Sequence, residues 1–261
     1  MSAAVEVRPT IDRRWLERAA SREPLTHAYA LWDLDRTPVQ VRFASAVRGE
    51  ETVGYLLIWL GQRERPVVHW YGAVDLAGPL LKAFPAAPFL AVVPPEVEPT
   101  VAAAFPGAVP TALRMMLRER AWLDRRAGSV RRLAREDRPQ LEALVQGEDA
   151  PDLGFYLGVD PGAEPIWGAF AGGRLVGVAR AAVRLARLWV LGGVFVQPAH
   201  RNEGLGAALV TAVVIRAEAS GAAVGLYARE EPANALRLYE RLGFREVGRR
   251  FWLDVRVPRP G

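Results

Sequence analysis

The stretch that decides the fold is Val194 to Ala208, with the sequence VFVQPAHRNEGLGAA. It reads as the end of an apolar strand, a short polar turn with one arginine, two glycines two positions apart, and the start of an alanine-rich helix. Such a turn directs backbone N–H groups that have no intrahelical partner toward one point, where the helix dipole is positive. We therefore predict an anion site there, and a pyrophosphate fits it.

Other glycine motifs fit this stretch less well. A phosphate-binding P-loop needs Gly-Lys-Ser/Thr, which the chain lacks. A dinucleotide fingerprint has a third glycine where Leu209 stands, and its glycines follow the strand directly, whereas residues 197–203 intervene here. A plain glycine-capped turn leaves Arg201 and Gly206 unexplained.

The surrounding residues predict a mixed α/β domain. We expect strands at 130–134, 166–171, 175–185, 188–196, 222–228 and 245–255, and helices at 136–145, 204–220 and 232–242. The strand 188–196 is apolar on both faces and is expected at the centre of the sheet. Gly172 and Gly173 predict a hairpin turn, and Gly243 ends the last helix.

The first half of the chain shows a similar order with weaker signals. We expect helices at 11–22, 76–84 and 96–105, and strands at 39–47, 52–60, 67–71, 89–93 and 112–120. No glycine turn follows its third strand, where Gly72-Ala73-Val74-Asp75 stands instead. This half is therefore interpreted as a degenerate copy of the second, and an unrelated α+β domain is the alternative. The charged stretch from Glu119 to Val130 predicts the boundary, giving domains 1–125 and 126–261.

Two ordered motifs carry a resemblance to a known family. Arg201, Gly204 and Gly206 match Arg/Gln-x-x-Gly-x-Gly/Ala, and Tyr239, Gly243 and Phe244 match Tyr-x-x-x-Gly-Phe. The second half thus resembles the GCN5-related N-acetyltransferase (GNAT) superfamily. The first half resembles it only in element order, as in tandem members with one inactive copy. The resemblance implies a mixed α/β sheet of the GNAT fold in 126–261 and a degenerate GNAT-like α/β fold in 1–125.

The resemblance also implies acetyl-CoA, or another acyl-CoA, as the co-substrate. Its pyrophosphate would lie on the backbone of Arg201, Asn202, Glu203, Gly204, Leu205, Gly206 and Ala207. Its pantetheine arm would pair with the strand edge at Val194, Phe195 and Val196. Gly192 and Gly193 mark a bulge or splay that opens this strand. Backbone N–H groups of the strand would stabilise the developing oxyanion.

The resemblance gives roles to three residues near the end of the chain. Tyr239 would donate a proton to the departing CoA thiolate; by position alone it is an edge tyrosine. Asn234 would contact the pantetheine or form a local hydrogen bond. Arg241 would reach the CoA phosphates or pair with a neighbouring glutamate on the surface.

The general base is not assigned. The strand 188–196 contains no acid. The candidates are Glu148, Asp149 and Asp152 in the loop after the first helix of the second half, and Glu230 and Glu231 at the end of the penultimate strand. Each of them is also interpreted as a solvated loop acid. His200 is interpreted as a packing residue.

Composition limits the other functions. The 261 residues include no cysteine, which excludes disulfides, thiolate zinc sites and a cysteine nucleophile. The three histidines have no metal-ligand spacing, so no metal is expected. The chain has a net charge of +5, but its arginine clusters are short and lack interleaved aromatics, so we expect no nucleic-acid partner. We expect a cytoplasmic protein without membrane contact, since neither a signal peptide nor an apolar span is evident.

These observations lead to one function and one alternative. We expect an N-acetyltransferase that moves an acetyl group from acetyl-CoA directly to a primary amine in a ternary complex. The acceptor would be a small molecule or a peptide, and a homodimer is left open. The first half would shape the acceptor pocket, where Trp59, Trp70 and Tyr71 either line it or pack in the core. The alternative is a non-catalytic acyl-CoA sensor, which fits the missing strand acid.

Overall fold

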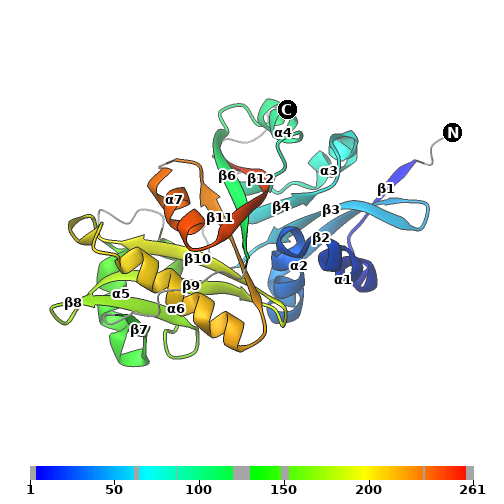
Figure 1. The fold of residues 1–261 in the computed structure, drawn as a ribbon. Helices are drawn as coiled ribbons and strands as arrows, with labels where there is room; N and C mark the ends of the chain where they lie inside the picture. Colours follow the sequence, from blue (N-terminus) through cyan, green and yellow to red (C-terminus); the bar gives the residue numbers. More distant parts are fainter. Residues whose placement is uncertain are drawn as a thin grey trace. The chain divides into compact units, whose positions relative to one another are not determined.

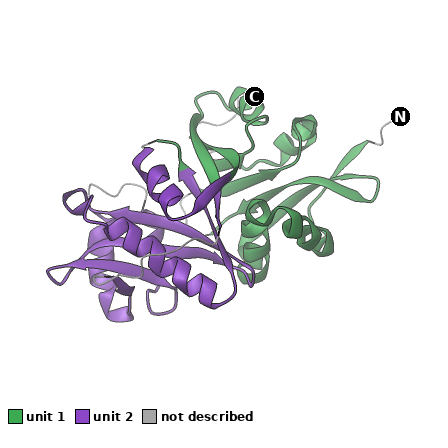
Figure 2. Cartoon of the chain, viewed as in Figure 1, with its two compact units in different colours: residues 1–115, 229–231, 247–261 green, residues 116–228, 232–246 purple. Residues whose placement is uncertain are grey.

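The computed structural model describes residues 4–61, 65–86, 88–119, 130–147, 153–231 and 233–256. The chain forms two compact units, shown in Figure 2. Unit 1 contains residues 1–115, 229–231 and 247–261, and unit 2 contains residues 116–228 and 232–246. The predicted boundary between residues 125 and 126 lies outside the described residues, so the division into 1–125 and 126–261 stays a prediction.

Unit 1 is built on a mixed sheet whose strands run in the order β1-β2-β3-β4-β5-β12. Neighbouring strands are antiparallel except β4 and β5, which are parallel. Its elements are β1 (Val5–Arg8), α1 (Arg13–Arg22), α2 (Pro24–Arg36), β2 (Val41–Arg48), β3 (Glu51–Trp59), β4 (Val67–Tyr71), α3 (Ala77–Leu80), β5 (Phe89–Val93), α4 (Glu98–Ala104), most of β6 (Val109–Arg118), and the end of β12 (Phe244–Val255).

The last strand of the chain completes the core of unit 1. Phe251 to Val255 pair with Val93 to Phe89 of β5. Leu253 and Val255 are buried in the same apolar cluster as Phe89. Trp70 also packs in this cluster, which confirms the core interpretation for that residue.

Unit 2 carries a mixed sheet in the order β7-β8-β9-β10-β11 (Figure 1). Its elements are β7 (Val130–Arg132), α5 (Arg138–Val145), β8 (Ile166–Ala171), β9 (Arg174–Arg184), β10 (Leu188–Val196), α6 (Leu205–Ala219), β11 (Ala223–Arg229), α7 (Ala233–Arg241) and the start of β12. β10 lies between antiparallel β9 and parallel β11, so its predicted central place is confirmed. Gly172 and Gly173 both have positive φ, as a two-residue hairpin turn requires.

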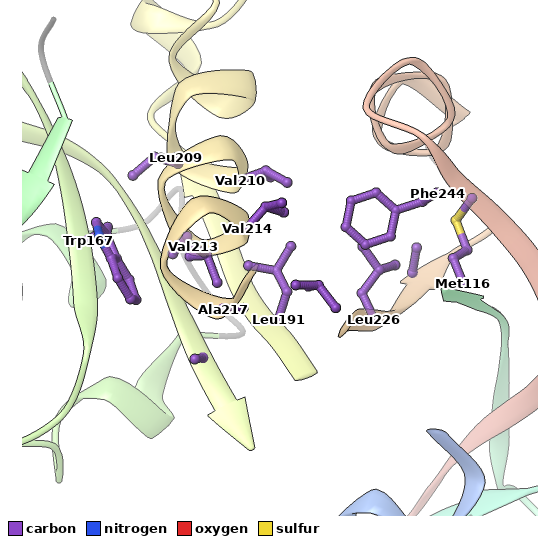
Figure 3. Packing of buried hydrophobic residues seen from close by; sticks show 14 of the residues in the cluster. Met116, Trp167, Leu191, Leu209, Val210, Val213, Val214, Ala217, Leu226 and Phe244 are labelled. Atoms are coloured by element: carbon purple, nitrogen blue, oxygen red, sulfur yellow. The ribbon is translucent and has the colours of Figure 1, made fainter. Parts of the chain in front are cut away.

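Helix α6 covers one face of this sheet (Figure 3). Its side chains Leu209, Val210, Val213, Val214 and Ala217 are fully buried in one cluster with residues of β8 to β11. Met116 of β6 and Phe244 of β12 belong to the same cluster. Burying each of these large apolar side chains stabilises the unit by roughly 1.5–3 kcal/mol.

Helix α5 covers the opposite face. Leu141, Leu144 and Val145 pack with Leu175 and Val178 of β9, whereas the neighbouring Ala179 packs on the α6 side. Val178 and Ala179 follow the two-residue period of a strand, whereas Leu175 lies beyond the register shift between β8 and β9. The two faces of the sheet are therefore separate environments, which matters for the site described below.

One predicted helix differs from the structure, and one helix was not predicted. The helix expected at 76–84 is divided into the short α3 and a 3-10 turn on each side of it. Pro79 lies inside α3 and has no N–H, so it cannot donate the helical hydrogen bond to the carbonyl of residue 75. Helix α2 was not predicted, because His27 and Asp33 lie on its buried side and weaken the apolar period. With α2 and β1 included, both halves follow the order β-α-β-β-β-α-β-α-β, the first with two helices at the first α position.

Candidate functional site

The polar turn between β10 and α6 has a left-handed backbone at two positions. Asn202 has a φ of 66° and Gly204 a φ of 80°. Asparagine tolerates this region better than most residues with a Cβ atom, and glycine adopts it without strain. The two residues reverse the chain so that α6 begins at Leu205 with Gly204 as its N-cap.

The first turn of α6 presents free backbone donors. The first intrahelical bond runs from the N–H of Ala208 to the carbonyl of Gly204 at 3.0 Å. The N–H groups of Leu205, Gly206 and Ala207 therefore precede the ladder and have no intrahelical acceptor. The N-cap residue is glycine, so no side chain at that position caps them. These are the donors that the predicted anion site requires.

The space in front of these donors is open. A Cβ atom built on Gly204 meets no atom within 4 Å, and one built on Gly206 meets only Leu238 Cδ2 at 3.4 Å. Residues 201–204 are exposed. The side chain of Arg201 turns back, and its Nε donates to the carbonyl of Val196 at 3.1 Å. This hydrogen bond links the exposed turn to the end of β10.

Strand β10 separates from β11 before it reaches the turn. The parallel pairing runs from Leu188–Ala223 to Leu191–Leu226. β10 then continues through Gly192 to Val196, all of which are half-buried. The register with β9 shifts between Gly192 and Phe195, and Gly193 has a φ of 61°. The bulge predicted at Gly192-Gly193 is confirmed.

Two aromatic residues hold this bulge. The hydroxyl of Tyr156 donates to the carbonyl of Gly193 at 2.9 Å. A Cβ atom on Gly193 would lie 2.6 Å from Phe155 Cζ and 2.7 Å from the Tyr156 oxygen, so only glycine fits. Burial raises the pKa of Tyr156 well above its usual range and keeps its hydroxyl protonated. The sequence analysis missed both aromatic residues, which carry no motif.

Tyr239 lies on α7, close to the start of α6. It is half-buried and packs against the α6 core, with its ring 5.8 Å from that of Phe244. The preceding residue, Leu238, is the side chain nearest to the Cβ position of Gly206. Burial raises the pKa of Tyr239 to about 12, so the hydroxyl holds its proton at neutral pH. The two motifs of the sequence therefore meet in unit 2.

Comparison with known families agrees with this geometry. A model of the acetyltransferase (GNAT) family matches residues 129–244. These residues form a GNAT domain. No curated protein sequence matches the chain.

Solved structures share the fold over nearly the whole chain. A Drosophila protein is 16% identical, with a TM-score of 0.68 and coverage of 95% of this chain and 98% of that one. A GCN5-related N-acetyltransferase from Sphaerobacter thermophilus is 17% identical, with a TM-score of 0.63 and coverage of 98% and 96%. A tandem GNAT protein from the clavulanic acid biosynthesis pathway is 16% identical, with a TM-score of 0.57 and coverage of 96% and 98%. The predicted mixed α/β GNAT fold is confirmed.

The remaining candidate residues of the GNAT domain have local contacts. Asn234 is exposed, and its Oδ1 accepts from the N–H of Ala235 at 2.9 Å. Arg241 is exposed in the last turn of α7, where a cation interacts favourably with the helix dipole. His200 Nδ1 lies 3.5 Å from Glu203 Oε2. The proposed contacts of Asn234 and Arg241 with CoA stay predictions.

The candidate bases differ in their surroundings. Glu230 Oε1 lies 3.5 Å from Arg114 Nε and 3.7 Å from Arg249 Nη1, so its carboxylate is ion-paired within unit 1. Glu231 is exposed. Glu148, Asp149 and Asp152 lie outside the described residues.

Neither a metal centre nor a membrane-spanning helix occurs in the described parts of the chain. They contain no group of three or more His, Cys, Asp or Glu side chains arranged to hold a metal ion. In the same residues, no helix is long and apolar enough to cross a membrane.

Proposed function

We propose that the GNAT domain transfers an acetyl group from acetyl-CoA directly to a primary amine. The observation that carries this proposal is that two ligand-accessible features lie next to each other along the chain. The uncapped start of α6 offers backbone donors for a diphosphate, and only eight residues separate it from the end of β10, where the strand is bulged and parted from β11. A family match without this geometry would support the fold alone.

The residues present fit coenzyme A. Residues 201–207 supply amide N–H groups and an open surface, which suit a diphosphate better than they suit a metal or a neutral ligand. The edge of β10 at Val194, Phe195 and Val196 supplies alternating N–H and C=O groups for the amides of the pantetheine arm. The spacing of these two surfaces along one strand and its turn matches an elongated ligand.

Each residue then has a chemical task. Acetyl-CoA supplies the acetyl group as a thioester, which an uncharged amine attacks at the carbonyl carbon while the carbon–sulfur bond breaks. N–H groups of Val194 to Val196 stabilise the negative charge that develops on the carbonyl oxygen. The hydroxyl of Tyr239, protonated up to a pH of about 12, donates its proton to the sulfur. The amine nitrogen releases one proton to a base as the amide forms, and Tyr239 regains a proton from solvent, so the products are the N-acetylated amine and the free thiol of CoA.

The base that receives this proton lies outside strand β10. Strand β10 has no acid, and Glu230 is ion-paired to arginines. The loop acids Glu148, Asp149 and Asp152 are the proposed candidates. The absence of a strand acid also favours the second candidate function, an acyl-CoA sensor that binds the thioester without transferring the acetyl group.

One pair of measurements separates these functions. Calorimetric titration with acetyl-CoA is expected to give binding at one site per chain. Release of free CoA thiol is expected when a panel of primary amines is added at saturating acetyl-CoA. Binding with no amine-dependent release would support the sensor. No binding of acetyl-CoA or of CoA would contradict both.

A further inference from the structure

Arg180 occupies a special place beside the bulge. It lies on β9, directly opposite Gly192 of β10. Its guanidinium carbon stands 4.4 Å from the ring centre of Phe155 and 5.6 Å from that of Tyr156. These are the two aromatic residues that contact Gly193, so Arg180, its aromatic support and the opened strand form one cluster within unit 2.

The charge of Arg180 is not neutralised by the described part of the chain. The residue is half-buried, and its Nε atom is buried without a hydrogen-bond partner. Within the described residues, the other guanidinium nitrogens form no ion pair or hydrogen bond. Burying a charged group without an acceptor is unfavourable. An arginine held in this way is suited to an anion that arrives with a ligand.

Another arginine of the same strand shows the contrast. Arg184 is also largely buried, but its Nη1 donates to Glu164 Oε2 at 2.5 Å. The chain therefore supplies a carboxylate for Arg184 and, in its described residues, none for Arg180. The planar guanidinium of Arg180 lies over an aromatic ring, which fixes the direction of its N–H groups.

The face of the sheet decides which ligand meets Arg180. Val178, two residues earlier on β9, packs on the α5 face, while Ala179 and Ala181 pack beneath α6. By the alternation of a strand, Arg180 belongs to the α5 face together with Phe155 and Phe195. The diphosphate site begins at α6, on the other face. A ligand beside Arg180 is thus the acceptor and not the nucleotide end of the co-substrate.

We propose that Arg180 binds the carboxylate of the acceptor, so that the amine acceptor is an amino acid. The guanidinium fork accepts a carboxylate in a bidentate geometry. In an α-amino acid the amine and the carboxylate are bonded to the same carbon, so an acceptor anchored beside Gly192 carries its nitrogen close to the bulge. This inference rests on the proposed acetyl transfer and names its substrate class.

The test uses the full-length chain and pairs of acceptors. Glycine and the standard L-amino acids are each compared with their α-carboxamides, and kcat/KM for thiol release is measured at saturating acetyl-CoA. The quantity of interest is the carboxylate-to-carboxamide ratio in the wild type divided by the same ratio in Arg180→Gln. This double ratio cancels the different basicities of the two amines.

The expected result is a preference for carboxylates that depends on Arg180. Loss of a charge-assisted hydrogen bond predicts a double ratio of about tenfold to a hundredfold. Arg180→Lys keeps the charge but not the fork and is expected to restore part of the preference. Arg184→Gln is the control, with a double ratio near one. Thermal unfolding of each variant shows whether it is folded.

A double ratio near one for Arg180→Gln would overturn the inference, including the case in which Arg180 pairs with an acid of the chain itself. If the wild type acetylates no probe, binding decides. N-acetyl amino acids and their amides are then titrated into the CoA-saturated protein. Arg180-dependent preference for the carboxylate would keep the inference while the proposed transfer fails, and equal or absent binding of the two would overturn it.

Discussion

The turn after β10 and the turn after β4 occupy the same place in the element order of the two halves, yet they are built in opposite ways. After β10, an open turn leads into α6, a helix of 15 residues. After β4, a 3-10 turn (Val74–Leu76) leads into α3, a helix of four residues. A Cβ atom on Gly72 would lie 2.7 Å from Leu76 Cδ1, whereas one on Gly204 meets nothing within 4 Å. The turn after β4 is therefore filled by side-chain atoms, and the turn after β10 is open.

The difference has an electrostatic side as well. Asp75 stands in the turn after β4, where its carboxylate lies 3.3 Å from Arg48. A carboxylate at the start of a helix occupies the position that a bound anion would take. In unit 1 the chain supplies both the apolar plug and the negative charge. We infer that this half contributes to the fold without a second diphosphate site.

The strands before the two turns also differ, since β4 is regularly paired and β10 is bulged. β4 pairs with β3 from Tyr55–Tyr71 to Trp59–Val67 without a register shift. β10 is bulged at Gly193 and leaves β11 after Leu191. The repeated order of elements thus preserves a scaffold, while a few glycines and the side chains around them decide where a ligand fits.

The largest expected effect comes from closing the open turn. Gly206→Trp places an indole in front of the α6 amides and is expected to abolish binding of acetyl-CoA in calorimetry. Its matched control is Gly78→Trp in α3, where a Cβ atom meets nothing within 4 Å. The control is expected to bind one acetyl-CoA per chain, like the wild type. Unchanged affinity in the Gly206 variant, or a second site in the wild type, would contradict the comparison.

A smaller effect is expected from Tyr239→Phe. Removing a general acid lowers kcat by roughly a hundredfold or more. The ring stays in place against Phe244, so the affinity for CoA is expected to change by less than about twofold. Tyr29→Phe is the control from unit 1, since the ring of Tyr29 stacks on His69 at 5.0 Å and remains in the variant. Equal values of kcat in the Tyr239 variant and the wild type would remove the proposed acid.

Much of the second half could be predicted because its signals are local. The bounds of β8 and β10 follow from apolar runs that end at glycine, proline or polar residues, and Gly243 has a positive φ as the end of α7 requires. The sequence could not predict that most of the last strand, β12, belongs to unit 1. The alternation in β12 indicates a strand, but it does not say which sheet the strand joins.

The residues of the candidate site also fall into two groups, those that short motifs predict and those that only the structure reveals. Gly204, Gly206 and Tyr239 stand in short motifs, so the sequence alone brings attention to them. Tyr156 is 37 residues away from Gly193, and Arg180 becomes informative only when its aromatic neighbours and its missing acceptor are known. Contacts between distant residues leave no periodic trace in the sequence.

The smallest expected effect tests how the bulge is held. Tyr156→Phe removes the hydroxyl that donates to the Gly193 carbonyl and leaves this acceptor without that partner. Since an unsatisfied buried group costs about 1–3 kcal/mol, the free energy of unfolding is expected to fall by about that amount in urea denaturation. The freed bulge is also expected to lower kcat/KM more than the affinity for CoA, because the diphosphate turn is not touched. The control is Tyr55→Phe in unit 1, which loses the 2.7 Å hydrogen bond to His27 and is expected to lose stability without a change in kcat. If both variants lose stability and neither loses activity, the bulge of β10 supports the fold and not the reaction, and the contrast between β4 and β10 would reduce to the turn alone.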